Sequence, residues 1–276
     1  MARASRSAAR LGIALVALCV ACASTPTVQE EREHAKEIER QARVEFDVLH
    51  DRVVDNYIDD IGETLVRAAG PQAFDYSFTV VDDEDPNALA APGGAIFITT
   101  QMILTVRNVS ELAGVLGHEV GHIVKRHSAQ NMVRAKNAGI LRNVAVLAAG
   151  IFGGGYAANT ADFLTGISAL AYINNYSREA ESEADAFAVG LLPRAGYEPE
   201  GLVSMFETLN NLTGHRKASF ASSHPAPADR MEATQALIDA SEVPAGLRTT
   251  DDGRLEIIQA RIRLLTGRTD KSRKRP

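Results

Sequence analysis

Two histidines four residues apart, His118 and His122, constrain this chain more than any other feature. In an α-helix that spacing is roughly 400° of rotation, so both imidazoles project from one face, a turn apart. Such a pair suits one tetrahedral Zn²⁺ bound through nitrogen. Glu119 lies about 100° around the same helix, too far round to be a natural third ligand but placed to act as general base on a water. The pattern predicts a helix that carries a site for one zinc ion.

The neighbours of this motif argue against an exposed helix that carries histidines by coincidence. Burying unliganded histidines among apolar residues would be unfavourable. The apolar residues of the segment are Leu112, Val115, Leu116, Val120, Ile123 and Val124. His127 lies nine residues after His118, roughly 180° around the same helix. We therefore expect His127 to face away from the metal, as a surface or capping residue.

A catalytic zinc site needs a third protein ligand and an open fourth position. The best source is the acidic segment 177–185, where spacing alone leaves four candidates, Glu179, Glu181, Glu183 and Asp185. For any single acid a solvated helix face is the more common explanation. Glu181 and Asp185 share a face, however, because they are four residues apart. One of the two can bind the metal while the other orients a histidine N–H.

The composition describes a folded chain and excludes several classes of protein. Of 276 residues, 45% are hydrophobic and 23% are charged, which excludes a disordered, collagen-like or coiled-coil protein. The net charge of −6 argues against nucleic acid as the main partner. The two cysteines, Cys19 and Cys22, both lie near the N-terminus, so the body of the chain contains no disulfide framework.

The first residues have the proportions of a bacterial lipoprotein signal peptide. Arginines precede an apolar stretch over residues 11–21, which is too short to span a bilayer. The small Ala21 stands directly before Cys22, as in a lipobox, although Cys19 occupies the usual leucine position. We expect cleavage before Cys22 and lipid attachment to its thiol; ordinary signal-peptidase cleavage nearby is the alternative. The leader predicts a periplasmic protein that is lipid-anchored, with the outer membrane as the expected site.

Periodicity over the rest of the chain predicts an α+β domain that is mostly α-helical and has a small sheet. The expected helices cover residues 30–49, 51–68, 110–137, 177–192, 199–212, 228–240 and 255–265. The expected strands cover 74–81 and 95–99, and the Gly-rich apolar stretch 138–172 is expected to form a buried helical hairpin. The chain is thereby divided into a signal peptide (1–21), a tether (22–29), one folded domain (30–268) and a basic tail (269–276).

Five motifs in order carry a resemblance to a known family. They are Asn87-Ala88 with Pro92-Gly93-Gly94, the apolar approach to His118-Glu119-Val120-Gly121-His122, Ser177-Arg178 with Glu181 and Ala184-Asp185, Ala195-Gly196-Tyr197, and Ser223-His224-Pro225 with Asp229-Arg230. Together they resemble the HtpX and CAAX-prenyl-protease type of gluzincin metallopeptidases, and most of all its soluble periplasmic branch. Integral members of that family have membrane spans after the zinc helix, where this chain is too short and broken by glycines.

The resemblance implies a zincin-like fold and a set of metal-site residues. It implies that His118, His122 and Glu181 bind one Zn²⁺, and that Glu119 is the catalytic base. Asp185 and Arg178 are then expected to contact the metal ligands without binding the metal themselves.

Two further roles follow from the resemblance. His224 is the favoured donor to the oxyanion because of its Ser-His-Pro loop, with Arg178 and Tyr176 as alternatives. Two other roles stay open for His224: a ligand that fills the open fourth zinc position and keeps the enzyme latent, or a cap of the helix that begins near residue 228. The strand after the glycine pair is expected to be an edge strand along which substrates pair, with Gly94, Ala95, Ile96 and Phe97 as substrate-binding residues.

The implied function is a zinc-dependent endopeptidase of the bacterial envelope that hydrolyses misfolded or unassembled proteins. Its expected partners are protein or peptide substrates, the membrane through the lipid, and the outer-membrane assembly machinery. The alternative is a non-catalytic chaperone or scaffold lipoprotein that keeps zinc only for folding. The intact Glu119 favours the enzyme, because a structural zinc site has no use for a general base and is usually closed by four protein ligands.

Overall fold

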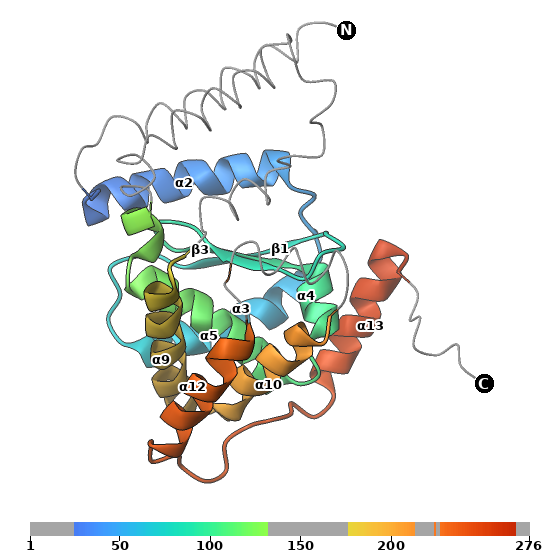
Figure 1. The fold of residues 1–276 in the computed structure, drawn as a ribbon. Coiled ribbons are helices and arrows are strands. Elements are labelled where there is room, and N and C mark those ends of the chain that lie inside the picture. The colour runs from blue at the N-terminus through green and yellow to red at the C-terminus, as the bar shows by residue number, and fades with distance from the viewer. Residues whose placement is uncertain (1–24, 132–175, 213–223, 225–226, 269–276) are drawn as a thin grey trace, which may run out of the picture.

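The computed structural model describes residues 25–131, 176–212, 224 and 227–268. The predicted signal peptide, helical hairpin and basic tail lie outside these residues. Helices dominate the described part, and they surround one small sheet (Figure 1). The α+β, mostly α prediction is confirmed. No helix in this part of the chain combines the length and apolar character needed to cross a membrane.

The elements follow one another in a fixed order along the chain. They are α2 (Val28–Glu45), α3 (Arg52–Ala69), β1 (Ser77–Val81), β2 (Ala88–Ala90), β3 (Ala95–Thr99), α4 (Thr100–Thr105), α5 (Val109–Val124), α9 (Arg178–Arg194), α10 (Glu200–Asn210), α12 (Pro227–Asp239) and α13 (Arg254–Thr266).

Side-chain caps explain where two of the predicted helices begin. Asp51 begins α3, because its side chain accepts hydrogen bonds from the backbone N–H groups of Val53 and Val54. Ser177 begins α9 in the same way, by accepting from the Ala180 N–H. The helices predicted over 199–212, 228–240 and 255–265 correspond to α10, α12 and α13.

Two helix predictions were wrong at their C-terminal ends. The helix expected over 110–137 begins at Val109, behind an Asn108 cap, and ends at Val124. Arg126 follows with φ of 58°, in the left-handed region, which turns the chain away from the helix axis. The helix expected over 30–49 ends at Glu45, because Phe46 leaves it to pack on the sheet against Phe97.

The sheet has the order β1-β3-β2, so β3 is its central strand. β1 pairs with β3 in parallel along its whole length, and β2 pairs antiparallel with Ile96, Phe97 and Ile98. The expectation that the strand beginning at Gly94, Ala95, Ile96 and Phe97 is an edge strand is therefore wrong, while the substrate-binding role of these residues stays a prediction. A free edge is not available there, because the short strand Ala88–Ala90 occupies the position beside β3.

The helix that carries the two histidines lies at the centre of the fold. Every residue of α5 from Val109 to Ile123 is buried. The helix packs against α9, α10, α3 and the sheet. α2 lies on the opposite side of the sheet from α5 (Figure 1). The fold thus places the predicted metal motif in the interior, within reach of side chains from α9 and from the start of α12.

Candidate metal centre

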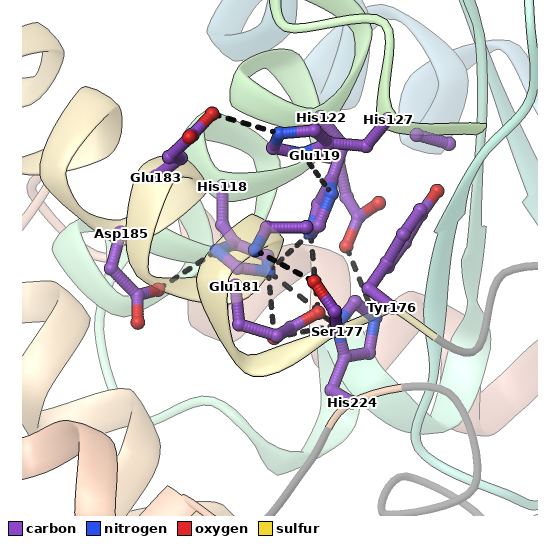
Figure 2. Close-up of polar contacts among 12 residues, drawn as sticks. His118, Glu119, His122, His127, Tyr176, Ser177, Glu181, Glu183, Asp185 and His224 are labelled. Atoms are coloured by element: carbon purple, nitrogen blue, oxygen red, sulfur yellow. Dashed lines mark hydrogen bonds and ion pairs between the residues drawn. The ribbon is translucent and has the colours of Figure 1, made fainter. Parts of the chain in front are cut away.

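Four side chains from three parts of the fold converge on one point. α5 supplies His118 and His122, α9 supplies Glu181, and the segment before α12 supplies His224 (Figure 2). One ligand atom from each lies within 4.8 Å of all the others, and all four residues are buried. The structure therefore brings together the three residues predicted to bind metal and adds a fourth donor.

The distances within this cluster suit a small cation. The Nε2 atoms of His118 and His122 face each other at 2.9 Å. The carboxylate of Glu181 approaches both, with Oε2 at 3.6 Å from the former and Oε1 at 3.5 Å from the latter. His224 Nδ1 lies 3.0 Å from Glu181 Oε1. Three imidazole nitrogens and one carboxylate are a donor set typical of zinc-type divalent ions.

The carboxylates beside His118 favour positive charge in the cluster. Its Nδ1 lies 2.9 Å from Asp185 Oδ1, so Nδ1–H donates to that carboxylate and Nε2 faces the cluster. Burial and the nearby Arg230 lower the pKa of His118, but hydrogen bonds to Asp185 and Glu181 outweigh them and raise it to about 9. Two imidazole nitrogens face each other here beside a carboxylate, so a metal cation fits the point where they meet.

Glu119 lies beside the cluster but is not one of the four residues whose ligand atoms converge. Its side chain is buried, and its Oε2 has no hydrogen-bond partner among the described residues. His224 Nε2 lies 3.5 Å from its other oxygen. Burial raises the pKa of Glu119, against the opposing charges of His224 and His118 and a hydrogen bond from the Ala90 N–H. A buried carboxyl whose pKa is raised in this way suits proton transfer near neutral pH.

Arg230 is the site residue to which the sequence analysis gave no role. Its Nη1 lies 2.5 Å from Glu181 Oε2, while Nε and Nη2 donate to the two oxygens of Asp185 at 2.8 and 2.5 Å. Burial raises the pKa of Glu181, but the charges of His224 and Arg230 outweigh it and hold that pKa well below its usual value. The Asp229-Arg230 motif, six residues after His224, was the available signal.

Arg178 and Tyr176, the two alternative hydrogen-bond donors to the oxyanion, lie in different places. Arg178 is exposed at the start of α9, whereas the guanidinium that contacts the cluster is that of Arg230. The role expected for Arg178 stays a prediction. Tyr176 is buried and stacks on the ring of His122, with centroids 3.9 Å apart and an interplanar angle of 17°. Its hydroxyl lies 2.6 Å from Ser128 Oγ.

His127 was predicted to face away from the metal, and the structure overturns that prediction. Only 3% of the residue is exposed, and its Nδ1 lies 2.9 Å from Nδ1 of His122. The helical-wheel argument failed because α5 ends at Val124 and the turn at Arg126 brings the chain back toward the helix.

The sequence profile of peptidase family M48 matches residues 53–238, more than half of the chain and all four residues of the cluster. The chain belongs to peptidase family M48. Membership confirms the resemblance to gluzincin metallopeptidases and implies a metal ion, which the four converging donors fit.

This M48 chain is similar to several named bacterial proteases. A Vibrio cholerae protein assigned as a beta-barrel assembly-enhancing protease is 31% identical over 75% of this chain and 44% of its own length. Metalloprotease YcaL of Escherichia coli is 36% identical over 56% of this chain and 59% of its own. The beta-barrel assembly-enhancing protease of Escherichia coli is 25% identical over 75% of this chain and 44% of its own. The M48 chain spans about half the length of these relatives.

Proposed function

We propose that this chain is a zinc-dependent endopeptidase. The observation that carries the proposal is the position of Glu119, a buried carboxyl with a raised pKa, in the wall of a cluster of four metal-binding donors. A site built only to bind metal does not need a carboxyl group there, whereas peptide hydrolysis needs a general base beside the metal.

His118, His122 and Glu181 would hold the zinc ion, and Asp185 would fix the ring of His118 by accepting its Nδ1–H. Zinc bound by these residues would act as a Lewis acid that polarises the substrate carbonyl and eases deprotonation of water. Glu119 accepts the proton as the water oxygen attacks the carbonyl carbon. It then delivers that proton to the amide nitrogen as the C–N bond breaks.

His224 is the residue that can switch this site between two states. Its Nδ1 lies 3.0 Å from Glu181 Oε1, a position from which it could bind the metal as a fourth ligand and close the site. With the imidazole off the metal, the same ring could donate a hydrogen bond to the oxyanion during turnover. We propose both roles, a latent closed state and an open catalytic one, for this single residue.

Substrate pairing belongs to β2 rather than β3. The Ala90 N–H donates to Glu119, and the Ala90 carbonyl accepts from Ser128 Oγ at 3.2 Å, so both groups point away from β3. A substrate strand that replaced these contacts would lie directly beside Glu119. We propose β2, Ala88–Ala90, as the strand that extended peptides join.

The cellular role rests on the relatives and on the leader of the chain. Two of the relatives described above are named beta-barrel assembly-enhancing proteases. We propose that this chain cleaves misfolded or unassembled envelope proteins, near the outer-membrane assembly machinery. Lipid attachment at Cys22, in the part of the chain outside the described residues, would keep it in the periplasm on the outer membrane.

A non-catalytic, zinc-stabilised chaperone or scaffold is the second candidate. One observation favours it, because the cluster contains four protein donors, as closed structural zinc sites do. Replacing Glu119 separates the two candidates, because a scaffold needs the residues that bind zinc but does not need Glu119.

The test compares Glu119→Gln with wild type for zinc content and for cleavage of casein. We expect full zinc content and a rate lower by about 10²–10⁴-fold, because only the proton transfer is removed. Glu181→Gln is the contrasting variant, which should lose zinc as well. Glu179→Gln, exposed on the same helix, is the matched control and should retain both properties. Cleavage by Glu119→Gln at a near wild-type rate would overturn the proposal.

A further inference from the structure

His127 lies behind the metal cluster, on the far side of His122. Its Nδ1 is 2.9 Å from Nδ1 of His122, and its Nε2 is 3.3 Å from Oε2 of Glu183 (Figure 2). The residue is buried, whereas the side chain of Glu183 is 59% exposed. The three side chains form a line from the protein surface to a residue of the metal cluster.

We propose that His127 is a positioning residue that fixes the ring and tautomer of the metal ligand His122, and that Glu183 in turn fixes His127. The inference rests on the proposed function only in taking His122 as a ligand. It assigns a role to a histidine outside the donor set and to an acid that does not reach the cluster.

The hydrogen positions in this line are determined by the chemistry of the imidazole ring. A ring that binds metal through Nε2 must carry its proton on Nδ1, so His122 Nδ1–H donates to His127. His127 Nδ1 then accepts, which places its own proton on Nε2. That N–H donates to the carboxylate of Glu183. Every ring nitrogen has one role, and both rings are neutral.

The same helix supports both ligand rings in this arrangement. α9 carries Glu181 as a ligand and Asp185 as the direct acceptor from His118. Glu183, between them in sequence, supports His122 through the intervening imidazole. Tyr176 stacks on the face of the His122 ring. This packing constrains the plane of the His122 ring, while the hydrogen bond to His127 sets the rotation of the ring within that plane. Such support typically changes metal affinity by about 10–100-fold.

The local backbone is built to place His127 in this position. Arg126 adopts φ of 58°, in the left-handed region that is unfavourable for a non-glycine residue. Its Nε donates to Glu31 Oε1 of α2 at 2.7 Å, and this contact holds the turn. Without the turn a continuing helix would carry His127 away from His122, as the helical-wheel argument predicted.

The experiment measures zinc affinity of the full chain by competition with a chromogenic chelator. His127→Leu removes the acceptor and leaves His122 Nδ1–H unpaired, so we expect zinc to bind about 10–100-fold more weakly. His127→Gln can accept the same hydrogen bond through its side-chain oxygen, so we expect most of the affinity to return. The melting temperature of each metal-free variant reports packing separately. His127→Met, which is flexible, replaces the leucine variant if that does not fold.

The outcomes distinguish this inference from the proposed function. Unchanged affinity in the apolar variant, or equal weakening in the apolar and glutamine variants, would overturn the role of His127 while leaving zinc binding by the wild type intact. Failure of the wild type to bind zinc would instead contradict the proposed function. In the zinc-loaded wild type, ¹⁵N NMR should show the proton of His127 on Nε2; a proton on Nδ1 would also overturn the inference.

Discussion

Arg230 provides the positive charge that balances the acids around the metal cluster. Its guanidinium forms an ion pair with Glu181 and donates hydrogen bonds to both oxygens of Asp185, and it lies 4.4 Å above the ring of Phe206. Only 9% of the residue is exposed, so water cannot replace these contacts. A guanidinium is suited to this position because its planar fork bonds a carboxylate through two N–H groups and still stacks on an aromatic ring.

We predict that Arg230→Met destabilises the metal-free protein by about 3–5 kcal/mol, because it leaves two buried carboxylates without their charge partner. Arg230→Lys should fall between this variant and wild type, since an ammonium cannot reproduce the two-point contact. Urea unfolding measures the effect. Arg248→Met is the control: this guanidinium also stacks on a ring, that of Tyr197 at 4.3 Å, but the residue is exposed. Equal losses for the two methionine variants would contradict the charge-balance argument.

The sequence predicted the residues of the site best where the spacing was local. His118, Glu119 and His122 are held by one helix, so their relative positions follow from helix geometry. His127 was misplaced because the end of α5 depends on Arg126, whose turn is held by a contact with Glu31, 95 residues earlier. Contacts between residues so far apart leave no periodic signal.

At the scale of elements, α5 approaches its neighbours closely at two of its three glycines, Gly114 and Gly121. A Cβ at Gly114 would lie 3.1 Å from Leu202 Cα of α10, and one at Gly121 would lie 3.1 Å from the Ala184 carbonyl oxygen of α9. A Cβ at Gly117 would meet nothing closer than 3.8 Å. The distance between the metal helix and the helix that carries Glu181 is therefore set at Gly121.

We predict that Gly121→Ala pushes α9 away from α5 and weakens zinc binding by about tenfold or more, because Glu181 no longer reaches the two histidines. Overpacking should also cost about 1–3 kcal/mol of stability. Gly117→Ala is the matched control on the same helix. It should leave zinc affinity unchanged and can add up to about 1 kcal/mol through helix propensity. Zinc competition and thermal unfolding measure both variants, and similar zinc affinities for the two would rule out the spacing argument.

Helices were more predictable than the sheet, for a physical reason. The helix over residues 52–69 is encoded by its own apolar period and by the Asp51 cap, both local features. The position of β3 depends on pairing with Ala88–Ala90, a strand of three residues that is too short to show alternation. Strand order is a long-range property, so an edge strand was assigned to the wrong segment.

At the scale of the whole molecule, α2 is the helix whose position in the fold the sequence did not predict. It lies across the sheet from α5, yet it is linked to the metal side of the fold through Arg126. The Arg126 guanidinium also bonds the Pro26 carbonyl, close to the first described residue. A Cβ at Gly93 would lie 2.3 Å from the Glu31 carbonyl oxygen, so α2 sits directly on the turn between β2 and β3.

We predict that the ion pair between Glu31 and Arg126 is what fixes α2 on the sheet. Glu31 is 1% exposed, whereas the Arg126 side chain is 32% exposed, so water can compensate part of the loss. Glu31→Ala should therefore cost about 1–2 kcal/mol, near the lower end for hydrogen bonds to charged groups. Glu33→Ala, an exposed acid on the same helix that bonds Gln29, should cost less than about 0.5 kcal/mol.

Urea unfolding of the two single variants, and of Glu31→Ala combined with Arg126→Gln, measures this contribution. The double variant should lose less than the sum of the two single losses, because the residues act as a pair. Protease should cut α2 faster in Glu31→Ala than in Glu33→Ala, since a helix released from the sheet opens more often. If the two alanine variants unfold and are cut alike, another contact holds α2, and the turn at Arg126 keeps its left-handed conformation without help from the N-terminal helix.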